Sequence, residues 1–100
     1  MRVMLRAHID TAAGNEGIKS GALPLVIQKF MEKVKPEAAY FGLHEGVRSC
    51  WIVFDLQDSS LVPALLEDMF LQLGAEMEIG PVMNREELAK GLAAMSSSPA

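Results

Sequence analysis

The order in which two hydrophobic periodicities alternate along the chain constrains its fold more than any other feature. Residues 2–9 alternate between apolar side chains and a second set, which is typical of a strand. Helical spacing follows over 23–34, and two further strand-like stretches, 38–43 and 49–54, flank a short turn. Helical spacing returns over 62–73, and a last strand is expected over 75–79. The sequence therefore predicts strand, helix, strand, strand, helix, strand and then a short helix.

Single residues mark where these elements begin and end. Pro24 suits the first turn of a helix, and Pro36 ends that helix because the residue before a proline disfavours helical geometry. Gly74 is a fitting stop for the second long helix. Asn84, with Glu87 three residues later, imitates a capping box and predicts a short helix that reaches about residue 95.

Two segments are predicted to carry little regular structure. Residues 10–20 are polar and include Gly14 and Gly17, so we expect a loop with at most one helical turn. Residues 96–100 are small and polar, and are expected to form a disordered tail. Residues 1–95 are then expected to form a single domain, since 100 residues is near the commonest domain size.

The register of the central hairpin sorts the strand residues into two faces. If Glu45 and Gly46 form a two-residue loop, Tyr40 lies opposite Trp51 and Phe41 lies opposite Cys50. The helices would cover the purely apolar set. The other face mixes aromatic rings with charges of both signs, and its members are Arg6, His8, Tyr40, Trp51, Asp55, Glu76 and Glu78. A solvated face would show Lys, Thr and Ser instead, so this face is predicted to be covered.

Composition narrows the classes of function. A formal net charge of −4 without any basic run disfavours nucleic acid as a partner. Cys50 is the single cysteine, so no intrachain disulfide forms, which fits a cytoplasmic location. The first strand begins at the N-terminus and carries Arg2, so no signal peptide is expected. No apolar stretch approaches the roughly 20 residues that cross a bilayer, so no membrane association is expected.

The predicted element order is the split βαβ pattern of ferredoxin-like folds. That pattern implies an α+β fold, βαββαβ, with a four-stranded antiparallel sheet in the order four, one, three, two. The helices lie on one face, and a short C-terminal helix follows. Together with the segments KPEAAYF (residues 35–41) and WIVFDLQD (residues 51–58), the chain resembles the dimeric α/β-barrel superfamily over residues 2–83.

Within that superfamily, the chain resembles small uncharacterised bacterial proteins. The resemblance implies a homodimer in which two open faces close into a barrel around a cavity. Other members are muconolactone isomerase-like proteins, cofactor-free monooxygenases and haem-degrading monooxygenases. The haem-degrading members use an Asn, a Trp and a His, but Asn15 and Asn84 both lie outside the predicted strands, so haem chemistry is not expected.

Three residues of the predicted open face have two interpretations each. His8 is a candidate general acid or base, because its ordinary pKa lies near neutrality, or an interface histidine. Trp51 and Tyr40 either line a ligand pocket or form a cross-strand aromatic pair.

The charged residues of this face also have alternative roles. Arg6 can clamp a substrate carboxylate, or can pair with Glu78 or Asp55 inside a dimer. His8, Asp55 and Glu78 are of metal-ligand types, but no spacing motif supports a metal site. No cofactor and no metal are therefore expected.

Two functions follow from this reading. The first is a cytoplasmic homodimer that binds a small apolar or aromatic molecule on the open sheet face, using the ligand-binding candidates Arg6, Tyr40, Trp51, Asp55 and Glu78. The second is a cofactor-free isomerase or monooxygenase in which His8 transfers the proton. In that enzyme, Arg6 and Tyr40 would orient the substrate and Trp51 would shape the pocket.

Overall fold

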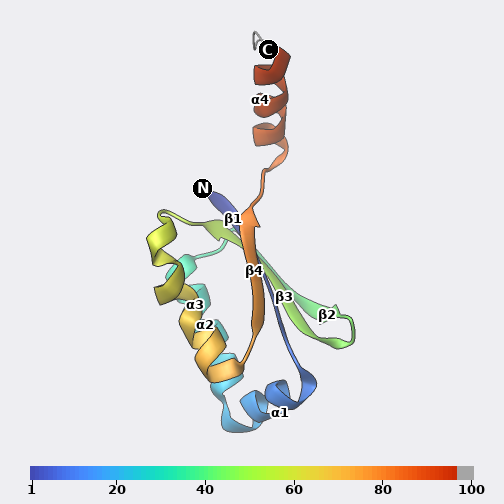
Figure 1. Ribbon diagram of the computed structural model, residues 1–100, viewed down its shortest axis with the longest axis vertical. Coiled ribbons are helices and arrows are strands. Elements are labelled where there is room, and N and C mark those ends of the chain that lie inside the picture. The colour runs from blue at the N-terminus through green and yellow to red at the C-terminus, as the bar shows by residue number, and fades with distance from the viewer. Residues whose placement is uncertain (97–100) are drawn as a thin grey trace.

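One antiparallel sheet organises the chain, with helices against one of its faces (Figure 1). The computed structural model describes residues 1–96. The sheet consists of β1 (Arg2–Ile9), β2 (Ala38–His44), β3 (Val47–Asp55) and β4 (Glu76–Pro81). Its order is β2-β3-β1-β4, and every neighbouring pair is antiparallel. Read from the β4 edge, this is the order four, one, three, two that the sequence predicts.

The helices are α1 (Thr11–Ser20), α2 (Ala22–Val34), α3 (Val62–Leu73) and α4 (Arg85–Ser96), with a short 3₁₀ helix, η1 (Ser59–Leu61), before α3. Helices α2 and α3 lie side by side on one face of the sheet, and α1 lies at the end where β1 finishes (Figure 1). The opposite face of the sheet carries no helix (Figure 1). The structure is therefore an α+β fold with an open antiparallel sheet.

The core lies between the sheet and α2 and α3. Leu5 and Ile52 are completely buried, and Phe54 is nearly so. The Phe30 ring of α2 meets the Phe54 ring edge-on, with centroids 5.6 Å apart and an interplanar angle of 87°. Met69 of α3 is also almost completely buried in this core.

The predicted division into two faces is confirmed for β1 and for β3 from Cys50 onward, where every second residue is buried. On β2, Phe41 and Leu43 remain exposed, so the helices do not cover that end of the sheet, contrary to the prediction.

The prediction of a loop over residues 10–20 was wrong, because this segment is helix α1. The Asp10 side chain caps it by accepting a hydrogen bond from the Ala13 amide at 2.7 Å. Gly14 and Gly17 argued against a helix, since glycine costs about 1 kcal/mol relative to alanine there. Both are buried where neighbours come close: a Cβ on Gly14 would clash with the Arg48 guanidinium. The close tertiary contacts at these two positions therefore account for glycine in this helix, despite its low helix propensity.

The predicted hairpin is confirmed. Its loop is Glu45–Gly46, with φ of 51° and 81°, the left-handed values that a tight hairpin turn requires. Tyr40 lies opposite Trp51, and Phe41 lies opposite Cys50.

Helix α4 extends away from the sheet, beyond the end that holds the N-terminus (Figure 1). The molecule measures 57 × 28 × 20 Å and has a radius of gyration of 16.3 Å, against about 13 Å for a compact chain of this size. The predicted capping box is confirmed: the Glu87 amide donates to Asn84 Oδ1 at 2.8 Å, and the Asn84 amide donates to Glu87 Oε1 at 3.0 Å. Ser96 ends this helix, and the rest of the expected tail, 97–100, lies outside the described residues.

Because of Cys50, the stability of this fold is expected to decrease at alkaline pH. Burial raises the pKa of the Cys50 thiol, and a hydrogen bond with the Ala7 backbone only partly offsets this effect. The neutral thiol is therefore favoured in the folded state, and its contribution is complete below about pH 8.5, the ordinary thiol pKa. As pH rises toward the folded-state pKa, that contribution is lost. We expect the difference in free energy of unfolding between wild type and Cys50→Ala to be smaller well above about pH 8.5 than at neutral pH. Chemical denaturation at the two pH values measures this difference. A pH-independent difference would contradict this account.

Candidate functional site

The face of the sheet without helices brings together most of the residues that the sequence singled out. Arg6 of β1 lies between Trp51 of β3 and Glu78 of β4. One pleat further along, His8 lies between Ser49 of β3 and Glu76 of β4. Tyr40 of β2 lies opposite Trp51 and is 68% exposed. The side chains of all four strands therefore meet on this face, and those of β1, β3 and β4 define one candidate site with Tyr40 beside it.

A hollow of about 430 Å³ lies on this face and has both polar and apolar walls. This volume is in the range of roughly 300–1,000 Å³ that small-molecule sites occupy. The hollow is bordered by Arg6, His8, Ser49, Trp51, Glu76 and Glu78, and at the hairpin end by His44 and Glu45.

His8 is held by a carboxylate. Its Nε2 lies 2.6 Å from Oε2 of Glu76, and the side chains of the two residues are 43% and 78% exposed. A hydrogen bond of this kind orients the imidazole and determines which ring nitrogen carries the proton. Since His8 also borders the hollow, its ring is placed to exchange a proton with a bound molecule.

Arg6 is exposed and forms no ion pair with any residue between 1 and 96. Of the two carboxylates considered for it, the register places only Glu78 beside it. Asp55 lies opposite Arg2 at the other end of β3, and binds the Met1 amino group at 2.8 Å. Asp55 therefore lies away from the hollow, while Arg6 keeps its charge available at the hollow's edge.

Sequence reasoning missed the contribution of Ser49, His44 and Glu45 to this hollow. His44 lies beside the hairpin loop and is largely exposed, with its Nε2 3.9 Å from Oε1 of Glu45. A signal for Ser49 was present. The predicted register already fixes the alternation of β3, and that alternation places Ser49 on the same face as Trp51.

Within residues 1–96, no group of three or more His, Cys, Asp or Glu side chains is arranged to hold a metal ion. Within the same part of the chain, no helix has the length and apolar character needed to cross a membrane. The sequence matches no protein-family model and no curated protein. The function of this site is therefore argued from the side chains of the open face themselves.

The His8–Glu76 pair is expected to orient the imidazole without stabilising the fold. Exposed ion pairs contribute about 0–1 kcal/mol, so Glu76→Gln should change the free energy of unfolding by no more than about 1 kcal/mol. Urea denaturation of dilute protein measures this, with Glu16→Gln as the control, because Glu16 forms an exposed pair with Lys19 on α1. A loss of several kcal/mol for Glu76→Gln alone would contradict the exposed position of the pair.

Proposed function

We propose that the chain forms a homodimer through its open sheet face, and that the enclosed hollow binds a small apolar or aromatic molecule. The exposure of aromatic and apolar side chains on this face carries the proposal. Tyr40 is largely exposed, and Met4, Trp51 and Val53 are only partly buried. Contiguous apolar surface of this kind usually marks a contact site.

The arrangement of the strands supports a ferredoxin-like fold of the dimeric α/β-barrel type. Taking α1 and η1 as additions to the connections, β1, α2, β2, β3, α3 and β4 follow the βαββαβ order. Both long helices leave the same face open, which is the face that such dimers join. A cytoplasmic location is part of the same proposal and is supported by the single, buried cysteine.

Helix α4 also supports a dimer. Leu88, Leu92 and Met95 recur at helical spacing on it, and all three are exposed. The stripe therefore does not pack on the sheet edge of its own chain. Packing against a second copy would remove these apolar side chains from water.

The chemistry of the hollow indicates what kind of molecule it takes. Trp51 offers an apolar wall, and Arg6 offers a guanidinium without an acidic partner among residues 1–96. A guanidinium binds a carboxylate through two parallel hydrogen bonds. An aromatic carboxylate such as phenylacetate therefore matches both features, and serves as a probe.

The alternative function is a cofactor-free isomerase or monooxygenase. The 2.6 Å contact between His8 and Glu76 favours it, because a carboxylate-held imidazole beside a hollow is the arrangement of a general acid or base. In an isomerisation, His8 would take a proton from one carbon of the substrate and return it to another. Arg6 would hold the substrate's anionic group during this transfer.

The dimer has a direct test. Light scattering at micromolar concentration should report twice the chain mass of 10.9 kDa. Tyr40→Glu should shift the protein to monomer, because it places a charge in the proposed interface. Leu71→Glu is the matched control, since Leu71 is 75% exposed on α3, which covers the other face of the sheet. A wild-type monomer, or equal effects of the two variants, would contradict the proposal.

The binding site has an independent test in Trp51, the only tryptophan of the chain. Phenylacetate should change Trp51 fluorescence saturably. Arg6→Gln should weaken this binding by about tenfold or more, since hydrogen bonds to charged groups contribute about 1.5–3 kcal/mol. Arg85→Gln, which removes an exposed guanidinium at the start of α4, should leave it unchanged. Equal affinities for wild type and Arg6→Gln would reject Arg6 as the anion-binding group.

The two candidate functions separate at His8. An enzyme should show a bell-shaped dependence of turnover on pH that His8→Ala abolishes. A binding protein should hold its ligand without turnover, and His8→Ala should then change affinity only.

A further inference from the structure

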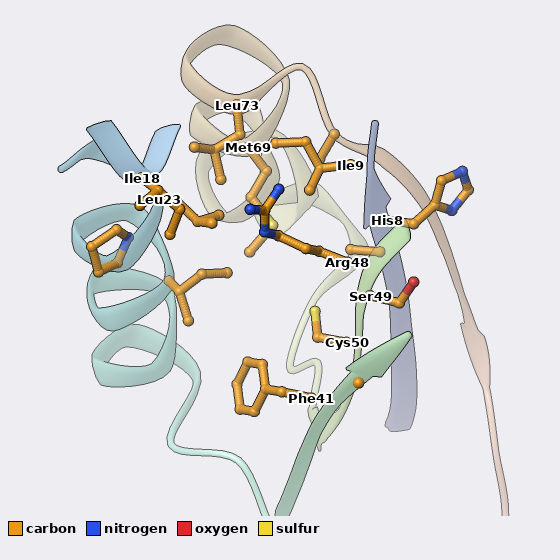
Figure 2. A pocket seen from close by; sticks show the side chains of 15 residues that line it. His8, Ile9, Ile18, Leu23, Phe41, Arg48, Ser49, Cys50, Met69 and Leu73 are labelled. Carbon is orange, nitrogen blue, oxygen red and sulfur yellow. The ribbon is translucent and has the colours of Figure 1, made fainter. Parts of the chain in front are cut away.

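A second hollow, of about 350 Å³, lies on the helix side of the sheet (Figure 2). It opens between α1 and α2 on one side and strands β2 and β3 on the other. Cys50, Met69 and Leu73 form its inner wall, and they belong to the hydrophobic core. Four residues border both this hollow and the one on the open face: Ala7, His8, Ser49 and Cys50. The His8 and Ser49 side chains point away from the helix-side hollow (Figure 2).

Apolar side chains at the rim of this helix-side hollow remain in contact with water. Phe41 of β2 is 59% exposed and Ile18 of α1 is 54% exposed, although both border the core. Leu23 and Ile27 of α2 continue the wall between them. A hydrocarbon group that entered here would cover this surface on both sides without displacing any polar group of the wall.

One cation reaches into this apolar surrounding. Arg48 of β3 extends from the strand toward the helices, across the hollow (Figure 2). It is half-buried, and its Nη2 donates to Asn15 Oδ1 at 3.1 Å. Among residues 1–96, no carboxylate forms an ion pair with it. Because a guanidinium has five N–H donors, most of its capacity is left for an added acceptor.

Helix α1 is shaped to accept this guanidinium. Gly14 is buried beneath it, and a Cβ at that position would clash with Arg48 Nη1. Two features thus hold the charge at the mouth of the hollow: the missing side chain at Gly14 and the amide oxygen of Asn15.

We propose that this helix-side hollow binds a carboxylate with an aliphatic tail. The tail lies against Phe41, Ile18 and Ile27, and the carboxylate accepts hydrogen bonds from Arg48. The planar guanidinium matches the two oxygens of a carboxylate, which distinguishes this ligand from an uncharged hydrocarbon. This site does not depend on Arg6 or Trp51, because the four residues of its proposed contacts border the helix-side hollow and not the hollow on the open face.

Calorimetric titration of the full chain with octanoate tests the proposal. Octanoate should bind saturably with one molecule per chain, whereas acetate, which lacks the tail, should not bind. Arg48→Gln should weaken octanoate binding by about tenfold or more, and should leave the weaker binding of octanol unchanged. Arg85→Gln is the control for a lost guanidinium elsewhere.

A second variant guards against misfolding of Arg48→Gln. Gly14→Ala favours the helix by propensity, yet forces the guanidinium away from its position. It should therefore keep the fold and still weaken octanoate binding. Absence of saturable octanoate binding, or equal affinity in wild type and Arg48→Gln, would overturn the proposal.

Alkylation of Cys50 at mildly alkaline pH locates the ligand, since the thiol lines the hollow (Figure 2). Octanoate should slow the reaction of Cys50 with N-ethylmaleimide in wild type, and should slow it less in Arg48→Gln. A different result would overturn the proposal: Cys50 becomes less reactive as the protein concentration rises, and octanoate does not bind. A second copy of the chain would then fill the hollow. Neither result depends on Trp51 fluorescence or on the effect of Arg6→Gln, so the two proposed sites fail or stand separately.

Discussion

Strand β1 holds the molecule together, because it pairs with β3 on one side and with β4 on the other. Its alternation sends Val3, Leu5, Ala7 and Ile9 into the core and sends Arg6 and His8 to the opposite face. A shift of register by one residue would exchange these two sets. The packing of the core therefore also determines which polar side chains meet on the open face, and the candidate chemistry of that face depends on the burial of Leu5.

Much of this arrangement follows from local patterns in the sequence. Period-two alternation identified β1, the Glu45–Gly46 turn set the register of β2 against β3, and Asn84 with Glu87 located the start of α4. These features depend on residues that are close together in the chain. Helix α1 was missed for the opposite reason. Its glycines at 14 and 17 are explained by Arg48 and Leu23, and the contact with Arg48 joins residues far apart in the sequence.

The same distinction applies to the candidate sites. The sequence placed Arg6, His8, Tyr40 and Trp51 on one face, since face follows from alternation, but it did not show that Asp55 lies at the far end with the Met1 amine. Arg48 was not singled out at all. Its importance comes from the gap that α1, α2 and the hairpin leave around it, and a gap between elements has no signature in the order of residues.

Helix α4 lies apart from the sheet, and this has a consequence for its own persistence. Helices of about 12 residues are marginal in water without tertiary packing, and α4 has 12 residues, none of them buried. Its first turn is anchored by the capping box and by the pairing of Arg2 with Glu87. With no buried residue, α4 is expected to open more easily than α2 and α3, whose inner faces are packed in the core. In the proposed homodimer, ordering of the far turns of α4 would be coupled to association, so that helix content itself would become a function of protein concentration.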